Sequence, residues 1–392
     1  MRYIILVLFL FMTYAEAKNS MSMTTFKRLE NIEALIAENR LTDAEAKIKV
    51  MLAEPPSRAT DKAYLFYTAG MFYLQRSSYD KAKKYILDAY KLEAMPEKTT
   101  LYLLQTLAGL SMQKEKFSEA VKYYKAYMER SIEPDKNIYL GLGAAYFYLK
   151  QYHNSIKVLN KAINQFEPKK SIYLMLFSSH YELKQLKSAT NVLEKMIKIW
   201  TDEKRYWLQL ASLYIERKKY NKSLEIMQIA MTKNYLLKER DILQYTYVLY
   251  EKNLPFKAAK VLKEAIAQGI VEKNQKNYEL LSTMYQEAKE RLEAIEALKK
   301  ASNYSSDGKN DLYIAQLYFE QENKFQSVIK YAKKAIQKGI KQKGNANMII
   351  AVAYSELDQM ENAKKHLINA SKYRKTKKAA EQWLESLGES YD

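Results

Sequence analysis

Three histidines, His153, His180 and His366, are the side chains of this sequence best suited to metal binding or proton transfer. No two of them are four residues apart, and the chain has no cysteine, so the ligand spacing of a zinc site is absent. The sequence contains repeated helical segments, described below, and His180 stands at a position where other copies carry tyrosine. We therefore expect the His180 side chain to pack against neighbouring helices. We therefore predict no metal site.

Other catalytic patterns are equally absent. The sequence has no glycine-rich phosphate loop, no nucleophile elbow and no Ser/His/Asp ordering. Its acidic residues recur at helical spacing beside lysines, which is typical of solvated helix faces. We predict that the chain is not an enzyme, with no catalytic residue and no cofactor.

Tyrosine is unusually frequent, with 34 in the chain. Many tyrosines recur at one position that is expected to be core. Others lie on the first helix of a predicted helical pair, where they would line a groove suited to an extended peptide, because tyrosine contributes contact area and a hydroxyl at low entropic cost. Packing between repeats is the open alternative for these candidate groove contacts, which are Tyr64, Tyr67, Tyr102, Tyr139 and Tyr173.

The elements that carry these tyrosines are seen most clearly in residues 344–373. Small residues at Ala351, Ala363 and Ala370 alternate with Tyr354 and Leu367 at offsets that let two antiparallel helices cross closely. This pattern resembles a tetratricopeptide-type helical hairpin. It recurs upstream with a period near 34 residues, as in the match of residues 149–151 to 183–185, both Leu-Lys-Gln.

The period predicts an all-α fold, a right-handed α-solenoid of about ten helical hairpins with a C-terminal capping helix. We divide the chain into a signal peptide (1–17), an atypical N-terminal hairpin (18–60), the repeat superhelix (61–375) and a capping helix with tail (376–392).

The first seventeen residues have the features of a secretory signal. Arg2 precedes an apolar run, Ile4–Met12, and Ala15-Glu16-Ala17 forms a small-x-small cleavage site. The run is shorter than the ~20 residues that span a bilayer, so we expect cleavage, with a retained anchor as the alternative. Export of a repeat protein without cysteine predicts a periplasmic location and a mature chain with no transmembrane span.

The formal net charge is +19. Such an excess attracts acidic partners over long range, or it reflects lysines on solvated helix faces, since lysine occurs in every repeat. Export argues against nucleic acid as the partner.

The second half carries a more particular resemblance. Its motifs are 206–210 (YWLQL), 255–259 (PFKAA), 276–277 (KN), 344–346 (GNA) and 378–384 (KAAEQWL). Over roughly residues 200–387 the chain resembles the exported tetratricopeptide proteins described as components of the TonB system. This resemblance implies an accessory of the TonB, ExbB and ExbD machinery.

The sequence thus predicts a non-enzymatic periplasmic scaffold that binds an extended segment of a periplasmic or membrane protein, such as a TonB-system component. The alternative is an envelope-assembly or chaperone-like factor that binds outer-membrane proteins or anionic envelope glycans.

Overall fold

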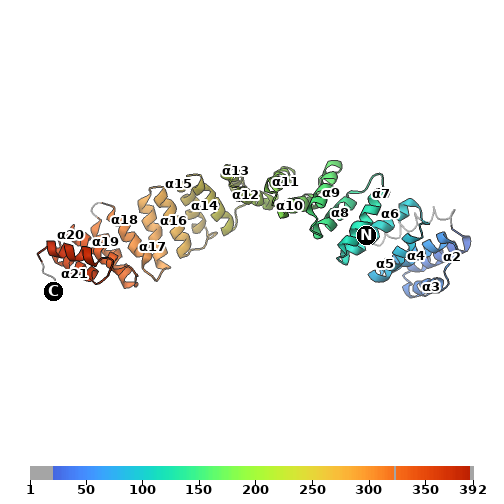
Figure 1. Ribbon diagram of the computed structural model, residues 1–392, viewed down its shortest axis with the longest axis horizontal. Helices are drawn as coiled ribbons and strands as arrows, with labels where there is room; N and C mark the ends of the chain where they lie inside the picture. Colours follow the sequence, from blue (N-terminus) through green and yellow to red (C-terminus); the bar gives the residue numbers. More distant parts are fainter. Residues whose placement is uncertain (1–20, 322–323, 389–392) are drawn as a thin grey trace. The chain divides into compact units, whose positions relative to one another are not determined.

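The computed structural model describes residues 21–321 and 324–388. In these residues the chain forms 21 α-helices and no strand (Figure 1). The prediction of an all-α fold is confirmed. The expected signal peptide, residues 1–17, lies outside the described residues.

The chain divides into two compact units, Met1–Ile199 and Trp200–Asp392. In unit 1 the described helices form five consecutive pairs: α2 (Met23–Ala37) with α3 (Leu41–Ala53), α4 (Ala59–Gln75) with α5 (Tyr79–Lys91), α6 (Glu97–Gln113) with α7 (Phe117–Arg130), α8 (Lys136–Tyr148) with α9 (Tyr152–Gln165), and α10 (Lys170–Glu182) with α11 (Leu186–Ile199).

Unit 2 continues the pattern with five more pairs and one closing helix. The helices are α12 (Lys204–Glu216) with α13 (Tyr220–Thr232), α14 (Glu239–Glu251) with α15 (Pro255–Ala267), α16 (Gln275–Glu287) with α17 (Arg291–Asn303), α18 (Lys309–Phe319) with α19 (Phe325–Gln337), α20 (Lys343–Ser355) with α21 (Met360–Ser371), and α22 (Lys377–Ser386). The expected ten hairpins and capping helix are therefore present in the described residues.

Small side chains hold each pair together. At the crossing point of the second helix nearly every hairpin has an alanine or serine that is fully buried: Ala44, Ala82, Ala120, Ser155, Ala189, Ser223, Ala258, Ala294 and Ala363. On the facing helix, a Cβ added at Gly143 would lie 2.6 Å from Leu159 Cδ2. Because the two backbones approach this closely, a larger residue would force the helices apart.

The turn inside each hairpin repeats one backbone geometry. Nine of these turns contain a non-glycine residue with φ between 54° and 62°: Asn39, Ser77, Glu115, Lys150, Lys184, Lys218, Asn253, Lys289 and Asp358. The next residue donates its N–H to a carbonyl five positions back, as Gln151 does to Tyr146 (2.8 Å) and Gln185 to His180 (2.9 Å). This left-handed cap ends the first helix and aligns the second.

The last helix covers the end of the repeats in unit 2. Ala380 and Leu384 of α22 are fully buried and pack with Ala351, Leu367 and Ala370 of the preceding hairpin. The boundaries of the sequence-based domains at residues 60 and 375 stay predictions, as does the handedness of the solenoid.

The two helices of a pair take different places in the unit. Successive first helices contact one another, in α2 with α4, α6 with α8 and α8 with α10 of unit 1, and in α12 with α14 and α18 with α20 of unit 2. Second helices of neighbouring hairpins make fewer contacts with each other. The first helices therefore form one surface of each unit, called here the first-helix surface, and the second helices form the second-helix surface.

Candidate functional site

The five predicted groove tyrosines differ in their surroundings. Tyr64 and Tyr67 are fully buried in the core of unit 1, and Tyr139 and Tyr173 are also buried. Tyr102 is half-buried, and its burial raises the pKa of its phenol above the usual value. A peptide contact by any of the five stays a prediction.

Tyr139 and Tyr173 occupy the same repeat position, and each lines a cavity. Tyr139 packs at a tilt on Phe166, with 5.7 Å between the ring centroids, beside a cavity of about 520 Å³ at the loop before α8. Tyr173 lines a smaller cavity between α9, α10 and α11. The structure therefore places these two rings toward second helices.

Exposed aromatic side chains on the first helices were not among the sequence-based candidates. Their exposed fractions lie between 37% and 55%, and they are Tyr148, Tyr181, Tyr247, Tyr250, Tyr313 and Phe319. Several directly follow the packing position at the end of the first helix, as Tyr148 follows Tyr146 by two residues and Phe319 follows Tyr318 by one. This offset is the sequence signal that could have identified them, because a step of one or two residues turns a helical side chain away from its partner helix.

These exposed rings are supported by neighbours. Tyr148 stacks on Phe117 with 4.9 Å between centroids. The hydroxyl groups of Tyr247 and Tyr220 are 3.3 Å apart, and this hydrogen bond raises the pKa of Tyr247. The first-helix surface therefore presents aromatic rings whose orientations are partly set before any partner binds.

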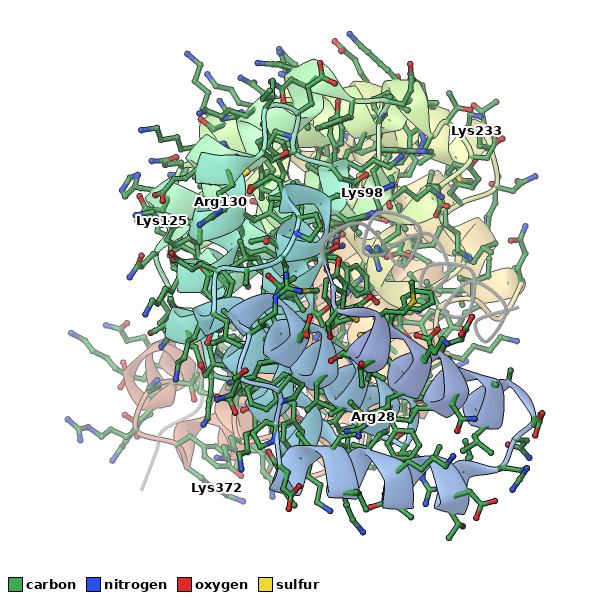
Figure 2. The ribbon with its side chains drawn as sticks, turned by 90° about the vertical axis from the view of Figure 1, so that its right-hand side faces the viewer. Arg28, Lys98, Lys125, Arg130, Lys233 and Lys372 are labelled. Atoms are coloured by element: carbon green, nitrogen blue, oxygen red, sulfur yellow. The ribbon has the colours of Figure 1, made fainter. Side chains whose placement is uncertain are left out.

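Positive charge is concentrated in the last two hairpins of unit 1. Residues 136–199 contain ten lysines and only three acidic residues, a net charge of +7, whereas residues 21–135 contain 18 basic and 16 acidic residues. Basic side chains, Lys125 of α7 among them, project from the helices into solvent (Figure 2). Lysines are spread along the chain, as the sequence suggested, but acidic residues are scarce in α8–α11.

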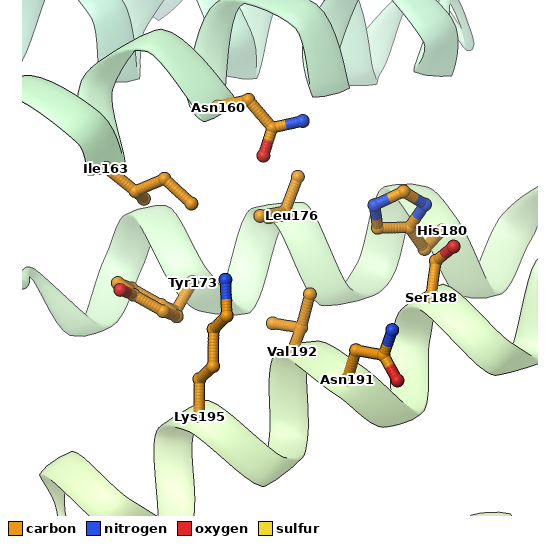
Figure 3. Close-up of a pocket in the computed structure, with 9 residues that line it drawn as sticks. All are labelled: Asn160, Ile163, Tyr173, Leu176, His180, Ser188, Asn191, Val192 and Lys195. Atoms are coloured by element: carbon orange, nitrogen blue, oxygen red, sulfur yellow. The ribbon is translucent and has the colours of Figure 1, made fainter.

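The cavity between α9, α10 and α11 lies within this basic region on the second-helix surface. It has a volume of about 200 Å³, and Figure 3 shows its side chains converging from three helices. They are Asn160 and Ile163 of α9, Tyr173, Leu176 and His180 of α10, and Ser188, Asn191, Val192 and Lys195 of α11. We call this space the α9–α11 cavity.

His180 forms one end of the α9–α11 cavity. Its Nδ1 lies 2.7 Å from Gln185 Oε1, which can only accept, so Nδ1 carries the proton and donates. The side chain is half-buried, and it holds the position at which other hairpins carry tyrosine.

Equivalent places in three other hairpins are filled by stacked rings. The ring pairs are Tyr73 with Tyr85 (5.7 Å between centroids, 16° between planes), Tyr318 with Tyr331 (5.8 Å, 22°) and Tyr354 with His366 (5.7 Å, 23°). In the α9–α11 cavity the corresponding residues are His180 and Val192, twelve positions apart like Tyr73 and Tyr85. The smaller side chains leave the space open.

In unit 2, lysine side chains also contact these stacked rings. Lys299 Nζ lies 5.6 Å from the ring centroid of Tyr318 and 5.9 Å from that of Tyr331. Lys333 Nζ lies 5.0 Å from the Tyr354 centroid and donates to its hydroxyl at 2.6 Å. These two lysines and the two ring pairs form what we call the α17–α21 seam.

A fully buried carboxylate lies in the same hairpins as the α17–α21 seam. Asp311 of α18 accepts a hydrogen bond from Ser302 Oγ (2.7 Å) and pairs with Lys334 (3.0 Å) and Lys338 (2.9 Å). Burial alone would raise the pKa of Asp311, but hydrogen bonds from Lys338, Ser302 and Lys334 outweigh it and lower the pKa below its usual value. Every charged group of the cluster has a partner inside it, so we assign the cluster to stability.

In the described residues, no group of three or more His, Cys, Asp or Glu side chains is arranged to hold a metal ion. Within that same part of the chain, no helix has the length and apolar character needed to cross a membrane.

Comparisons with known proteins support the repeat assignment. A model of the tetratricopeptide repeat family matches residues 137–165, the segment that forms α8 and α9. No curated protein matches the chain.

Similar solved structures share low sequence identity with this chain. A tetratricopeptide repeat protein from Parabacteroides merdae has 16% identity, with 65% of this chain and 96% of that chain covered and a TM-score of 0.38. The structure of Naa15/Naa10 bound to HypK-THB has 13% identity, coverage of 92% and 65%, and a TM-score of 0.47. YrrB, described as a TPR protein with an unusual peptide-binding site, has 18% identity, coverage of 42% and 84%, and a TM-score of 0.35.

The assignment depends on the match at α8 and α9 and on eight other hairpins, which repeat the same close helix crossing and turn. The chain therefore has an all-α fold of tetratricopeptide-type hairpins, and residues 137–165 match the tetratricopeptide repeat family itself.

Proposed function

We propose that this protein is a non-enzymatic scaffold for protein–protein interaction whose first-helix surface binds an extended segment of a partner. The observation that carries the proposal is the set of exposed aromatic side chains on first helices, which lie on α8 and α10 of unit 1 and on α14 and α18 of unit 2. Tyrosine and phenylalanine are strong contributors to protein interfaces because they bury a large area at a small cost in side-chain entropy.

We further propose that the protein acts in the periplasm as an accessory of the TonB–ExbB–ExbD system. The support for this is the sequence resemblance over residues 200–387 and the signal-like segment at residues 1–17. The net charge of +19 favours an acidic partner segment.

The test is a crosslinking capture from cell-envelope extracts with the full chain as bait. We expect recovery of TonB, ExbB or ExbD with the wild-type chain. Recovery of none of them, under conditions that preserve their known mutual contacts, would contradict the TonB assignment.

A pair of matched variants tests the surface itself. Tyr250→Ala with Phe319→Ala removes two first-helix rings that are 37% and 41% exposed. Ile229→Ala with Ile368→Ala removes second-helix side chains of similar exposure, 42% and 41%. Captured partner should fall by about tenfold or more only in the first variant; an equal loss in both would rule out the first-helix surface.

Two further measurements separate the alternatives. Binding to lipopolysaccharide or cell-wall preparations that weakens steeply with salt would favour the envelope-glycan alternative, because salt screens exposed charges. N-terminal sequencing of the mature protein should find a start at Lys18, and an intact Met1 would contradict a cleaved signal.

A further inference from the structure

We propose that the α9–α11 cavity on the second-helix surface binds an aromatic side chain from an acidic segment of a partner protein. This site is separate from the first-helix surface and goes beyond the scaffold function proposed above. It rests on the shape of the cavity, its unpaired polar groups and the charge around it.

Equivalent places in three other hairpins show what fits this cavity. Stacked ring pairs fill this position in the hairpins of α4 and α5, α18 and α19, and α20 and α21. His180 and Val192 leave about 200 Å³ empty instead. A cavity of about 150 Å³ is enough to hold a benzene ring, so one aromatic side chain from a partner fits the space that a second ring occupies elsewhere.

The walls suit such a ring. Leu176, Val192 and Tyr173 are buried and provide apolar contact (Figure 3). Burying an aromatic side chain against them removes apolar surface from water on both partners.

Four polar side chains at the rim of the cavity are available to bind a ligand. Asn160, Ser188, Asn191 and Lys195 make no side-chain hydrogen bond to the described part of the chain, yet all four converge on the cavity (Figure 3). Asn160 stands five residues after the small crossing residue, the place where Lys299 and Lys333 contact rings in the α17–α21 seam. These groups can donate to the backbone carbonyls and carboxylates that flank a bound ring.

The surrounding charge selects an acidic segment. Lys157 and Lys161 of α9, and Lys187 and Lys198 of α11, are exposed and form no ion pair with the described residues. With Lys195 they give one face of α9 and α11 an unbalanced positive charge. Acidic residues beside the partner's aromatic ring would therefore be attracted, and basic ones repelled.

The experiment measures binding of short fluorescent peptides to the full chain by anisotropy. The probe has a central tyrosine flanked by glutamates; one control replaces the tyrosine with alanine and another replaces the glutamates with lysines. We expect the probe to bind about tenfold or more tightly than either control. Equal binding of the alanine peptide would show attraction by charge alone and overturn the proposal.

Variants locate the site. His180→Tyr with Val192→Tyr recreates the ring pair of Tyr73 and Tyr85 inside the cavity, so the probe should lose about tenfold or more in affinity. Lys195→Glu changes only an exposed side chain and should also weaken the probe, whereas the matched reversal Lys125→Glu on α7 should not. Unchanged binding in both cavity variants, with circular dichroism confirming the fold, would overturn the proposal.

Binding of the probe to the α9–α11 cavity should not depend on the first-helix surface. The Tyr250→Ala, Phe319→Ala variant should bind the probe as the wild type does, because both substitutions lie in unit 2 and the α9–α11 cavity lies in unit 1. Loss of probe binding in that variant would place the peptide on the first-helix surface and count against the cavity.

Discussion

The α17–α21 seam and the α9–α11 cavity hold equivalent repeat positions but are built differently. In the α17–α21 seam, two ring pairs stack and two lysines lie over them. In the α9–α11 cavity, His180 and Val192 stand in place of a ring pair. Asn160, Ser188, Asn191 and Lys195 make no side-chain hydrogen bond there within the described residues. One hairpin backbone can therefore carry either a closed, self-satisfied surface or an open one, depending on two side chains twelve residues apart.

The two regions also differ in the free energy that aromatic contacts contribute to folding. A stacked aromatic pair contributes about 0.5–1.5 kcal/mol beyond its buried area, and a lysine over a ring adds about 0.5–2 kcal/mol. The α9–α11 cavity lacks both contributions. Stability is therefore concentrated where the rings are, and binding capacity where they are missing.

The largest expected effect comes from the buried carboxylate in the hairpins of the α17–α21 seam. Asp311→Ala removes the fully buried acceptor of Lys334 and Lys338, which are themselves 38% and 21% exposed and keep Ser302 as a partner, so we expect a loss of about 2–3 kcal/mol. Urea unfolding monitored by hydrogen exchange in α17–α19 measures the loss. The control Glu361→Ala removes a pair whose carboxylate is 83% exposed and should cost less than about 1 kcal/mol; equal losses would contradict the role assigned to Asp311.

Removing a ring tests the comparison directly. Tyr331→Ala deletes a half-buried partner of Tyr318 and Lys299 and should destabilise the protein by about 2 kcal/mol, below the ~3–5 kcal/mol of a fully buried aromatic residue. His180→Ala, at an already open place, should cost less than about 1 kcal/mol. Thermal unfolding of both variants measures the contrast, and a larger cost at His180 would reverse the comparison.

Closing the cavity should have a smaller and opposite effect. His180→Tyr with Val192→Tyr fills the α9–α11 cavity and should raise stability by about 1 kcal/mol, as cavity-filling substitutions commonly do. The reverse change, Tyr318→His with Tyr331→Val, should lower it. A rise in melting temperature in the first variant and a fall in the second would sharpen the comparison; destabilisation of both would show that the α9–α11 backbone cannot accept a ring pair.

The smallest effect concerns pH. Burial, and then the charge of Lys333, lower the pKa of His366 below 6.5, so the unfolded chain binds this proton more readily than the folded one. Stability contributed by neutral His366 is present above pH 6.5 and is lost as pH falls through 6.5 toward the folded pKa. Unfolding measured between pH 7.5 and 5 should become less pH-dependent in His366→Phe but not in the exposed control His153→Phe.

Much of the architecture could be predicted from the amino-acid sequence. Small residues such as Ala82 and Ser155 recur at the crossing points, and tyrosines such as Tyr146 precede the turns at a constant offset. Both signals act within one hairpin, through helix crossing and through the hydrogen bond that ends the first helix. Ten hairpins and the capping helix could be predicted for this reason.

The candidate site was harder to predict from the sequence. Tyr139 and Tyr148 lie on the same helix, yet one is buried against Phe166 and the other is 55% exposed. The concentration of charge in residues 136–199 was present in the sequence, but it shows only when acidic residues are counted together with lysines.

The sequence by itself determined the repeating helical pairs, because their spacing depends on contacts between residues less than one repeat apart. Only the tertiary structure decided which positions between neighbouring hairpins are filled. The α9–α11 cavity depends on side chains from three helices at once, and its volume follows from how α9 and α11 are held apart over α10. No local pattern encodes that separation, since it arises from the packing of one hairpin on the next.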